Sequence, residues 1–393
     1  VVHRAVDVPT VYYDWRGRSD AQRDRELRRL LAEDRAAGLD LATPPLMRLA
    51  IVTVTDDQVL LIWTSHHVLL DGWSLAEVFA EVCEQYAAIV AGRQPRLVAR
   101  RPFRDYLHWL CDQDDQQAED HWRKVLAGFE SPTALPYDRQ PLEAHRAESS
   151  EAVSVSLSAE QSSQLRTVAQ RNGLTVNTIV QGAWGLLLAR HSGERDVVFG
   201  TTASGRPAEL PGVESMIGMF INTVPTRVSV DGSRQVMSWL RELQAEQSES
   251  RRFDFVSLAQ LGNWSGLRHL DGSPERANLF DSVVVFENYP FDDASVGATG
   301  LRIREVAARD TTNFPLTLGA YLVDQLRFDL AYDPRLFDAA TIERLAERLR
   351  MLLVGIVSGP DRSLSQLPWM SADERHRVLV EWNDTDLAVP PVT

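Results

Sequence analysis

The stretch that decides the interpretation of this chain is SHHVLLDGWS, at residues 65–74. It places two imidazoles, a carboxylate and a glycine within seven residues. An aliphatic and Trp-containing run at 59–63 precedes it, and apolar residues at helical spacing follow it. This order puts the histidines at the carboxyl end of a strand, a common place for active sites. Because a histidine titrates near neutral pH, the cluster predicts proton handling at an amine or a thioester, as acyl transfer requires.

The residues of this cluster have distinct candidate roles. His67 is the candidate for catalysis. Strand alternation directs His66 to the opposite face, which predicts a structural role for one of the two. Asp71 either orients an imidazole, as in a Ser-His-Asp triad, or is buried against an arginine that holds the loop. Gly72 either permits a tight turn or turns its N–H toward a developing oxyanion.

Other kinds of site are disfavoured. The sequence has no GxSxG elbow or equivalent nucleophile, so direct transfer between two bound substrates is simpler than a covalent acyl-enzyme. We expect no metal site, because adjacent strand residues diverge and no second cluster of His, Cys or Glu accompanies His66 and His67. Cys83 and Cys111 lack a CxxC partner and are interpreted as free thiols.

The composition is that of an ordinary globular protein. Of 393 residues, 44% are hydrophobic and 24% charged, which suits one large core or, more readily, two. The 55 acidic against 41 basic residues give a net charge of −14, which argues against nucleic acid as a partner because phosphate binding needs a basic face. The sequence shows no apolar run of membrane-spanning length and no signal-peptide pattern, so we expect a cytoplasmic protein that does not enter a membrane.

Apolar periodicity predicts strands and helices in both halves of the chain. Ser158 and Gln161 have the spacing of a capping box, which starts a further helix. The sequence therefore predicts an α/β fold with two lobes, each with its own sheet. The expected strands are 47–54, 58–65, 152–157, 196–202, 223–230, 279–286 and 325–332, and the expected helices are 20–37, 74–91, 103–110, 115–126, 175–190, 238–249 and 341–356.

A Pro-bearing polar stretch without clear periodicity divides the chain. It predicts an N-terminal lobe at 1–128, an inter-lobe linker at 129–150 and a C-terminal lobe at 151–363. The character of the sequence changes at residue 364, and residues 364–393 are predicted to be a linker in which a few apolar residues serve as anchors. The end at 389–393 has no domain boundary, so we expect a fragment of something longer.

Further motifs follow the first in a fixed order, and together they resemble the condensation domain of non-ribosomal peptide synthetases, in the chloramphenicol-acetyltransferase-like superfamily. FRDYLHW at 103–109 is loosely similar to the family's YxDYAxW. IGMFINTVPTR at 217–227, after SGRP at 204–207, closely matches IGxFVNTxxxR. RDTTNFPL at 309–316 resembles RDxSxxPL, and FDSVVVFENYP at 280–290 is typical of the same domains. The resemblance covers nearly the whole chain.

The resemblance implies a fold and a reaction. Two chloramphenicol-acetyltransferase-like lobes are expected to form a V with a central tunnel. Phosphopantetheine arms presented by donor and acceptor peptidyl carrier domains enter it from opposite faces, and the domain itself binds no cofactor. The acceptor amine attacks the donor thioester near His67 and forms a peptide bond, while His67 either takes the amine proton or only hydrogen-bonds the amine. WNDT at 382–385 resembles the junction with a downstream adenylation domain.

The resemblance also implies residue roles. The family counterpart of Arg206 forms a salt bridge to that of Asp71, so this pair is expected to be structural. Residues next to His67 are expected to support the active site: His66, Asp71, Gly72, Trp73 and Ser74. Residues of the C-terminal lobe are expected to line or brace the donor side of the tunnel: Asn222, Thr223, Arg309, Asp310 and Asn313. The first two of these are expected to stabilise the crossing between the lobes.

The chain departs from the family pattern in two places. The first two motifs, SxAQxRLW and RHExLRTxF, are absent. Either the first part of the N-terminal lobe is missing from this fragment or, as we expect, that part lies elsewhere. RRFDFV at 251–256 replaces HQDxPFE. This second departure concerns how the chain crosses between the two lobes, and it does not affect the resemblance to the family.

Other members of the superfamily are alternatives. An epimerisation domain needs a glutamate-bearing motif in the second lobe, and GMFINTVP at 218–225 argues against it. A coenzyme-A-dependent acyltransferase does not account for the linker-like tail. A non-catalytic recruitment domain usually loses the second His or the Gly, and both are present. A cyclisation domain is excluded because it replaces the His pair with aspartates.

Overall fold

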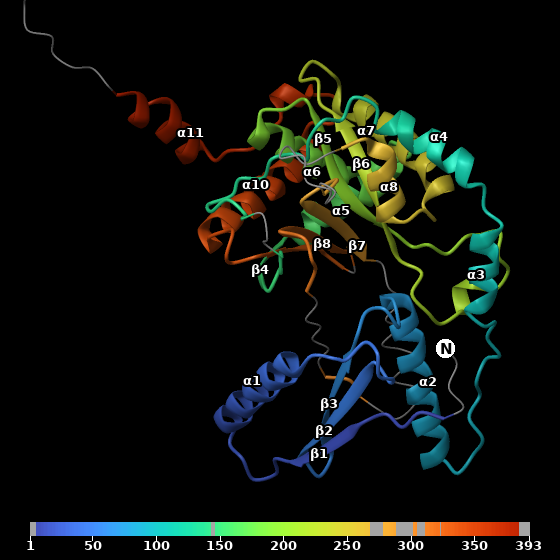
Figure 1. Cartoon of the computed structure of the whole chain (residues 1–393). Helices are drawn as coiled ribbons and strands as arrows, with labels where there is room; N and C mark the ends of the chain where they lie inside the picture. The colour runs from blue at the N-terminus through green and yellow to red at the C-terminus, as the bar shows by residue number, and fades with distance from the viewer. Residues whose placement is uncertain are drawn as a thin grey trace, which may run out of the picture. The chain divides into compact units, whose positions relative to one another are not determined.

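The computed structural model describes residues 5–142, 146–267, 278–287, 302–304, 311–322 and 324–384. It has a mixed α/β fold with two separate sheets, as predicted (Figure 1). The chain divides into two compact units that are interleaved along the sequence. The first unit takes residues 1–107, 206–220 and 289–303, and the second takes 108–205, 221–288 and 304–393.

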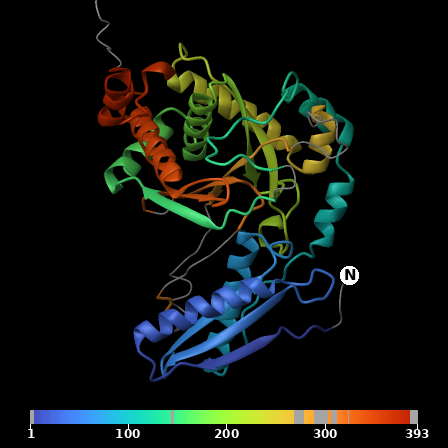
Figure 2. The same cartoon turned by 60° about the vertical axis from the view of Figure 1, so that its left-hand side comes forward.

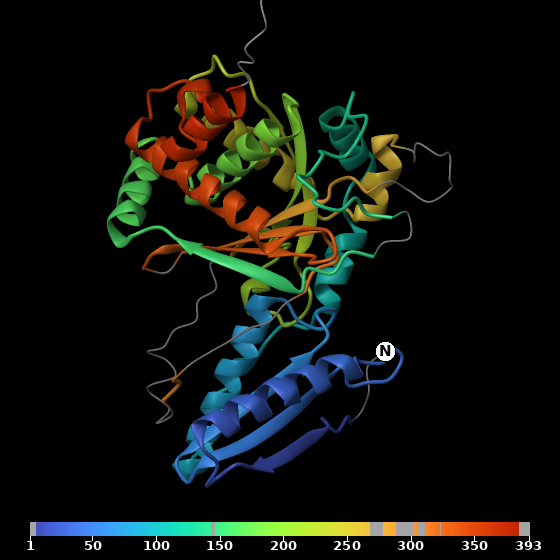
Figure 3. The same ribbon diagram turned by 90° about the vertical axis from the view of Figure 1, so that its left-hand side faces the viewer.

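The first unit is built on a three-stranded sheet in the order β1-β2-β3. β1 (Thr10–Asp14) is parallel to β2 (Met47–Thr55), and β2 is antiparallel to β3 (Gln58–Ser65). Helix α1 (Asp20–Ala37) connects the two parallel strands, because a parallel pair requires a crossover. The helix runs along the sheet in Figures 2 and 3.

Polar contacts attach α1 to this sheet. Asp34 forms an ion pair with Arg48 of β2 and accepts a hydrogen bond from the Thr64 hydroxyl of β3 at 2.6 Å. Burial by itself would raise the pKa of Asp34, but the bonds from Arg48 and Thr64 outweigh it and lower the pKa. These contacts tie the helix to β3, the strand that leads to the two histidines.

The second unit contains a six-stranded mixed sheet in the order β4-β9-β8-β7-β5-β6. The pairs β4/β9, β8/β9 and β5/β6 are antiparallel, whereas β5/β7 and β7/β8 are parallel. Its strands are β4 (Glu151–Ser156), β5 (Asp196–Ala203), β6 (Asn222–Ser229), β7 (Ser282–Glu287), β8 (Leu316–Leu322) and β9 (Leu326–Tyr332).

Helices cover both faces of the six-stranded sheet (Figures 1 and 3). Val197 and Phe199 of β5 lie in one apolar core, whereas Val198 lies in the other, as strand alternation requires. The larger core contains α5 (Ala159–Arg171), α6 (Val176–Ser192), α7 (Val236–Ser250) and α10 (Ala339–Ser358), and the smaller contains α4 (Asp115–Val125) and α8 (Leu258–Ser265). In the described part of the chain, no helix is long and apolar enough to cross a membrane.

Trp369 fixes the residues that follow α10 to the second unit. The guanidinium carbons of Arg190 and Arg348 lie 5.4 and 5.1 Å from the centre of its ring. Arg190 also donates to the carbonyl of Leu364 at 2.6 Å. The start of the predicted C-terminal linker is therefore packed onto the fold before α11 (Ala372–Leu379) begins.

Most predicted elements are present with limits shifted by a few residues. The helix at 20–37 and the strand at 58–65 have the predicted limits. β1, β8, α8 and α11 were not predicted. β8 lacks the alternation of a half-buried strand because its first five residues are all buried. The strand expected at 279–286 begins only at Ser282.

The compact units are laid out differently from the predicted lobes. The units are interleaved, whereas the lobes expected at 1–128 and 151–363 are contiguous. The chain passes from the first unit to the second within α3 (Arg104–Cys111), and 206–220 returns to the first unit. The domain boundaries stay a prediction.

Candidate active site

The two histidines lie in a short loop between β3 and helix α2 (Gly72–Val90). β3 ends at Ser65, so His66 and His67 follow the strand directly. His66 is half-buried and His67 is exposed. Among the residues that the structure describes, none forms a hydrogen bond or an ion pair with the His67 ring. This imidazole is therefore available to an incoming group.

His66 anchors the strand end of this loop. Its backbone N–H donates to the carbonyl of Leu46 at 2.9 Å, and its carbonyl accepts a hydrogen bond from the Leu69 N–H at 3.1 Å. Its ring Nδ1 accepts a hydrogen bond from the Val68 N–H at 3.1 Å. Both backbone polar groups and one ring nitrogen of His66 are thus occupied within the loop.

Asp71 anchors the helix end of the loop by capping α2. Its backbone is extended, with φ −82° and ψ 171°, and its Oδ1 accepts a hydrogen bond from the Ser74 N–H at 2.7 Å. Such a cap satisfies one of the free N–H groups at a helix start. Gly72 is the first residue of the helix.

The carboxylate of Asp71 also pairs with Arg206, which lies 135 residues away in the sequence. Arg206 Nη2 donates to Oδ1 at 3.1 Å and to Oδ2 at 3.2 Å, and the Phe220 N–H donates to Oδ2 at 3.3 Å. The side chains of Asp71 and Arg206 are only 1% and 7% exposed. Burial lowers the pKa of Arg206, and the negative charge of Asp71 opposes that shift. A buried carboxylate with these partners holds structure and is not placed to orient His67 as a triad member.

Ser74 joins α2 to the 206–220 segment. Its hydroxyl donates to the carbonyl of Gly218 at 2.8 Å and accepts hydrogen bonds from the Gly218 N–H at 3.1 Å and from Arg206 Nη2 at 2.9 Å. The Asp71 N–H adds a bond to the same carbonyl at 3.1 Å. Ser74 is fully buried. The hydroxyl therefore uses its donor and both acceptor sites.

Other side chains hold the 206–220 segment by its backbone carbonyls. Trp73 Nε1 donates to Glu214 at 2.8 Å, and Arg100 Nη1 donates to Ser215 at 2.7 Å. Arg206 itself donates to two carbonyls of the segment, those of Val213 at 2.6 Å and Met216 at 3.0 Å. Because these bonds go to the backbone, they fix the path of the segment rather than select its side chains.

An aromatic cluster completes this part of the site. The Phe220 ring lies 5.0 Å from Phe103 and 4.6 Å from Tyr106, and the Arg206 guanidinium lies 4.0 Å from its centre. A Cβ on Gly218 would lie 2.2 Å from a ring carbon of Phe103. The FRDYLHW and IGMFINTVPTR motifs therefore contact each other through aromatic rings. The space beside the Phe103 ring at position 218 admits only glycine.

Asn222 and Thr223 lie in the second unit, at the start of β6. The Asn222 amide donates to the carbonyls of Asp254 at 2.7 Å and Val256 at 2.5 Å, and its Oδ1 accepts a hydrogen bond from the Thr223 N–H. The Trp122 indole donates to the Phe253 carbonyl at 2.9 Å. The 251–256 segment is thus bonded through its backbone, while the side chains of Phe253, Phe255 and Val256 pack in the smaller apolar core.

The remaining predicted donor-side residues are only partly described. Asn313 is exposed, shortly before β8 in the second unit. Arg309 and Asp310 lie outside the described residues. The structure thus brings Asp71, Arg206 and Ser74 together with the histidine loop, and it places Asn222 in a separate bonded cluster.

The sequence interpretation missed Arg100, Phe103, Tyr106 and Gly218 as parts of the site. Arg100 also pairs with Glu77 at 2.8 Å and with Glu81 at 2.6 Å on α2. Arg100 lies outside any helix or strand, so no periodic pattern in the sequence indicates that it pairs with α2 or bonds to Ser215. The motifs at 103–109 and 217–227 were the available signal, but a motif does not say which of its residues touch.

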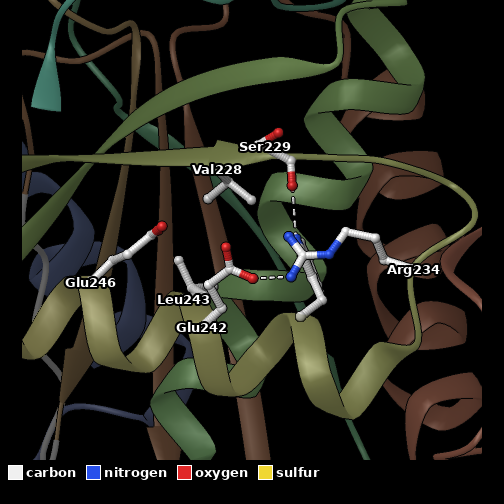
Figure 4. Close-up of a pocket in the computed structure, with 7 residues that line it drawn as sticks. Val228, Ser229, Arg234, Glu242, Leu243 and Glu246 are labelled. Atoms are coloured by element: carbon white, nitrogen blue, oxygen red, sulfur yellow. Dashed lines mark hydrogen bonds and ion pairs between the residues drawn. The ribbon is translucent and has the colours of Figure 1, made fainter.

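A small pocket in the second unit lies between β6 and α7 (Figure 4). Arg234 forms an ion pair with Glu242 there, and the Trp239 indole donates to the Ser229 carbonyl at 2.8 Å. Burial raises the pKa of Glu246, and the charge of Arg234 opposes that shift. None of the predicted site residues lines this pocket.

Comparison with known proteins identifies relatives over the whole chain. The family model described as "Condensation domain" matches residues 1–379. A linear gramicidin synthase polypeptide of Brevibacillus parabrevis is 40% identical over 99% of this chain, and bacitracin synthase 3 of Bacillus licheniformis is 36% identical over 96%. The chain spans only 8% and 6% of the lengths of these two proteins.

Solved structures show the same fold. The X-domain from teicoplanin biosynthesis superposes with a TM-score of 0.76 at 23% identity, covering 94% of this chain and 83% of that structure. The starter condensation domain of rhizomide synthetase superposes with a TM-score of 0.74 at 18% identity, covering 93% of this chain and 81% of that structure. These likenesses agree with the pair of chloramphenicol-acetyltransferase-like lobes that the sequence predicts.

Proposed function

Because this chain belongs to the family of condensation domains of non-ribosomal peptide synthetases, we propose that it forms an amide bond between two carrier-bound substrates. Domains of this family transfer acyl groups. The donor is an aminoacyl or peptidyl thioester, and the acceptor is the amine of a second aminoacyl thioester. The observation that carries the proposal is the exposed His67, whose ring has no bonding partner among the described residues. It lies on a loop anchored at both ends, by His66 and by the buried Asp71–Arg206 pair.

The proposed reaction is a direct transfer. The acceptor nitrogen attacks the carbonyl carbon of the donor thioester, the C–N bond forms, and the C–S bond breaks. The nitrogen loses one proton, and the departing sulfur gains one to become the thiol of the donor arm. No protein nucleophile is needed, in agreement with the sequence, which lacks a GxSxG elbow.

His67 acts at the amine in this proposal. An α-amino group has a pKa of about 8, so an appreciable fraction is already the free base at neutral pH. The demand on a general base is therefore modest, and holding two reactants in line supplies much of the rate enhancement. We propose that His67 accepts the proton or orients the amine through a hydrogen bond.

The other predicted residues have supporting roles in this proposal. His66, Asp71, Gly72, Trp73, Ser74 and Arg206 hold the loop and the start of α2. Residues of the second unit act on the donor side: Asn222, Thr223, Arg309, Asp310 and Asn313. Asn222 acts there by bracing the 251–256 loop through the carbonyls of Asp254 and Val256.

The proposed partners are donor and acceptor peptidyl carrier domains and a downstream adenylation domain. The carriers present the substrates on phosphopantetheine arms, which belong to the substrates and not to this domain. A likeness to a four-domain non-ribosomal peptide synthetase, with a TM-score of 0.74 at 19% identity, is compatible with this setting. WNDT at 382–385 supports the adenylation partner by its resemblance to that junction.

The test loads donor and acceptor carrier domains with a panel of aminoacyl groups and follows both carriers by intact-protein mass spectrometry. We expect the mass of the donor group to move from the donor carrier to the aminoacyl group on the acceptor carrier. An acceptor carrier loaded with an N-acetylated aminoacyl group is the matched control and should gain no mass. The absence of product with every pair would overturn the proposal and favour a recruitment domain. Because epimers have equal mass, the amino acids are also released and separated on a chiral column, and epimerised substrate without transfer would favour an epimerisation domain.

A further inference from the structure

We propose that Ser149 is a positioning residue that fixes the backbone at Asn313, so that the side-chain amide of Asn313 can bond to an amide group of the donor arm. The inference deepens the proposed function and rests on it for the activity readout. Ser149 lies in the stretch at 129–150 that the sequence predicts to be a linker, and the structure gives it contacts to the RDTTNFPL motif at 309–316.

The central observation is that Ser149 is bonded to the residues on both sides of Asn313. Its N–H donates to the carbonyl of Thr312 at 3.2 Å, and its hydroxyl donates to the carbonyl of Phe314 at 2.5 Å. The Thr312 hydroxyl in turn donates to the Ser149 hydroxyl at 3.3 Å. A single residue outside the motif thus holds the carbonyls before and after Asn313.

Ser149 is itself held in place. It is only 1% exposed, so water does not compete for the carbonyls to which it bonds. The N–H of the preceding residue, Glu148, donates to the carboxylate of Asp333 at 3.0 Å, and the Asp333 N–H donates to the carbonyl of Pro315 at 3.0 Å. Asp333 is fully buried. One buried residue therefore connects the backbone next to Ser149 with the end of the motif.

Asn313 is turned away from these contacts. The Phe314 ring stacks on Phe280 in the smaller core, with ring centres 5.7 Å apart, and the Thr312 hydroxyl is bonded to that of Thr317 at 2.7 Å. Asn313, between Thr312 and Phe314, is exposed, and within the described part of the chain no group bonds to its side-chain amide. This amide offers two N–H donors and an acceptor oxygen to an incoming group.

The group that suits a side-chain amide is another amide. The pantetheine portion of a carrier arm contains two amide groups, each with one N–H and one carbonyl that match the amide of Asn313. Binding must offset the loss of freedom of the residues that make the contact. The bonds from Ser149 reduce that loss, because they order the backbone at Asn313 before the arm arrives.

The experiment titrates a loaded donor carrier domain against the complete synthetase module, which supplies the acceptor carrier, and measures the single-turnover rate at each concentration. We expect Ser149→Ala and Asn313→Ala each to raise the half-saturating donor concentration about tenfold, the factor that corresponds to one lost hydrogen bond. Ser150→Ala, at the exposed neighbouring serine, is the matched control and should leave it unchanged. A variant that had only lost stability would contain less active module, with no change in this concentration. An unchanged value in Ser149→Ala would overturn the proposal.

The double variant tests whether Ser149 acts through Asn313. If it does, Ser149→Ala combined with Asn313→Ala should match Asn313→Ala alone, because the ordered backbone then has no amide to place. An increase equal to the product of the two single effects would contradict the positioning role. The increase should also be the same for glycyl and leucyl donors, and an increase confined to one of them would overturn the assignment to the arm.

A further measurement separates this proposal from the proposed function. Hydrogen–deuterium exchange of the complete module, followed by mass spectrometry, reports the opening of the backbone at 311–317 without any substrate. We expect faster exchange there in Ser149→Ala and no change in Ser150→Ala, and equal exchange in the two would contradict the proposal even in an active enzyme. If Ser149→Ala does not fold, Thr312→Val, which removes the hydroxyl that bonds to Ser149, replaces it with the same expectations. If the wild-type module forms no amide, the proposed function fails, while the exchange still decides whether Ser149 holds the motif.

Discussion

The hydroxyl of Ser74 and the backbone of Gly218 are bonded to each other in both directions. Ser74 Oγ donates to the Gly218 carbonyl at 2.8 Å and accepts a hydrogen bond from the Gly218 N–H at 3.1 Å. The Ser74 side chain thereby bonds to both polar backbone groups of Gly218. This link connects the helix after the histidine loop to the segment that supplies Arg206.

Ser74→Ala should lower the stability of the fold. It leaves the Gly218 N–H without its hydroxyl partner in a buried place, which typically costs about 1–3 kcal/mol, while the Gly218 carbonyl and Arg206 keep their bonds to Asp71. Chemical denaturation measures the free energy of unfolding. Ser163→Ala, on the exposed surface of α5, is the matched control, and equal values for the two variants would contradict the account.

Gly218→Ala should be destabilising because of its contact with Phe103. The added Cβ would lie 2.2 Å from the Phe103 ring, and overpacking of this kind costs about 1–3 kcal/mol. Phe103→Leu replaces the ring with a smaller side chain and so makes room for the added Cβ. The double variant should therefore lose less stability than the sum of the losses of the two single variants. Strict additivity in a double-mutant cycle would show that the two residues do not touch.

Asp71→Ala should lower stability by about 3–5 kcal/mol, because it leaves the buried Arg206 without its carboxylate. The loss should appear as poorer solubility and a lower melting temperature. Arg206→Met added to Asp71→Ala should recover part of it, since the uncompensated charge is then gone. A wild-type melting temperature in Asp71→Ala would argue against the buried pair.

The stability of the second unit should decrease in mild acid because of His191. Burial, reinforced by the charge of Arg348, lowers the pKa of His191 to about 4 from 6.5, although Glu374 opposes the shift. Between these two values the unfolded chain binds a proton that the folded chain does not, so the free energy of unfolding falls as the pH drops from about 7 to about 4. Above about pH 7 this group has no effect.

The check is the free energy of unfolding of wild type and His191→Gln across this pH range. His191 Nε2 lies 2.9 Å from Arg348 Nη1, an acceptor position that a glutamine oxygen can take without titrating. The difference between the two proteins should therefore grow toward low pH in favour of His191→Gln. Parallel curves would show that His191 is not the group responsible.

Much of the local structure around the site follows from the sequence. The strand at 58–65 and the helical pattern after Ser74 place His66 and His67 in a loop, because alternation gives way there to a 3.6-residue period. The capping box at Ser158 and Gln161 is present as predicted, since it depends only on residues three apart. Such features are encoded within one turn or one strand.

The tertiary contacts of the site do not follow from local pattern. Arg206 meets Asp71 across 135 residues, and only the resemblance to a family suggested that pair. Arg100 and Phe103 act on the 206–220 segment through carbonyls and ring packing, to which no local periodicity corresponds. β8 escaped prediction because burial of successive residues removes the alternation that identifies a strand.

The most direct test of the central claim, that His67 on its anchored loop acts in amide formation, is the single-turnover rate of transfer between loaded carriers for wild type and His67→Ala. His376→Ala, at an exposed histidine of α11, is the matched control. We predict that His67→Ala keeps the wild-type melting temperature and loses at least about a hundredfold in rate, as loss of a group that handles a proton typically does, while His376→Ala keeps both. A wild-type rate in His67→Ala would contradict the account.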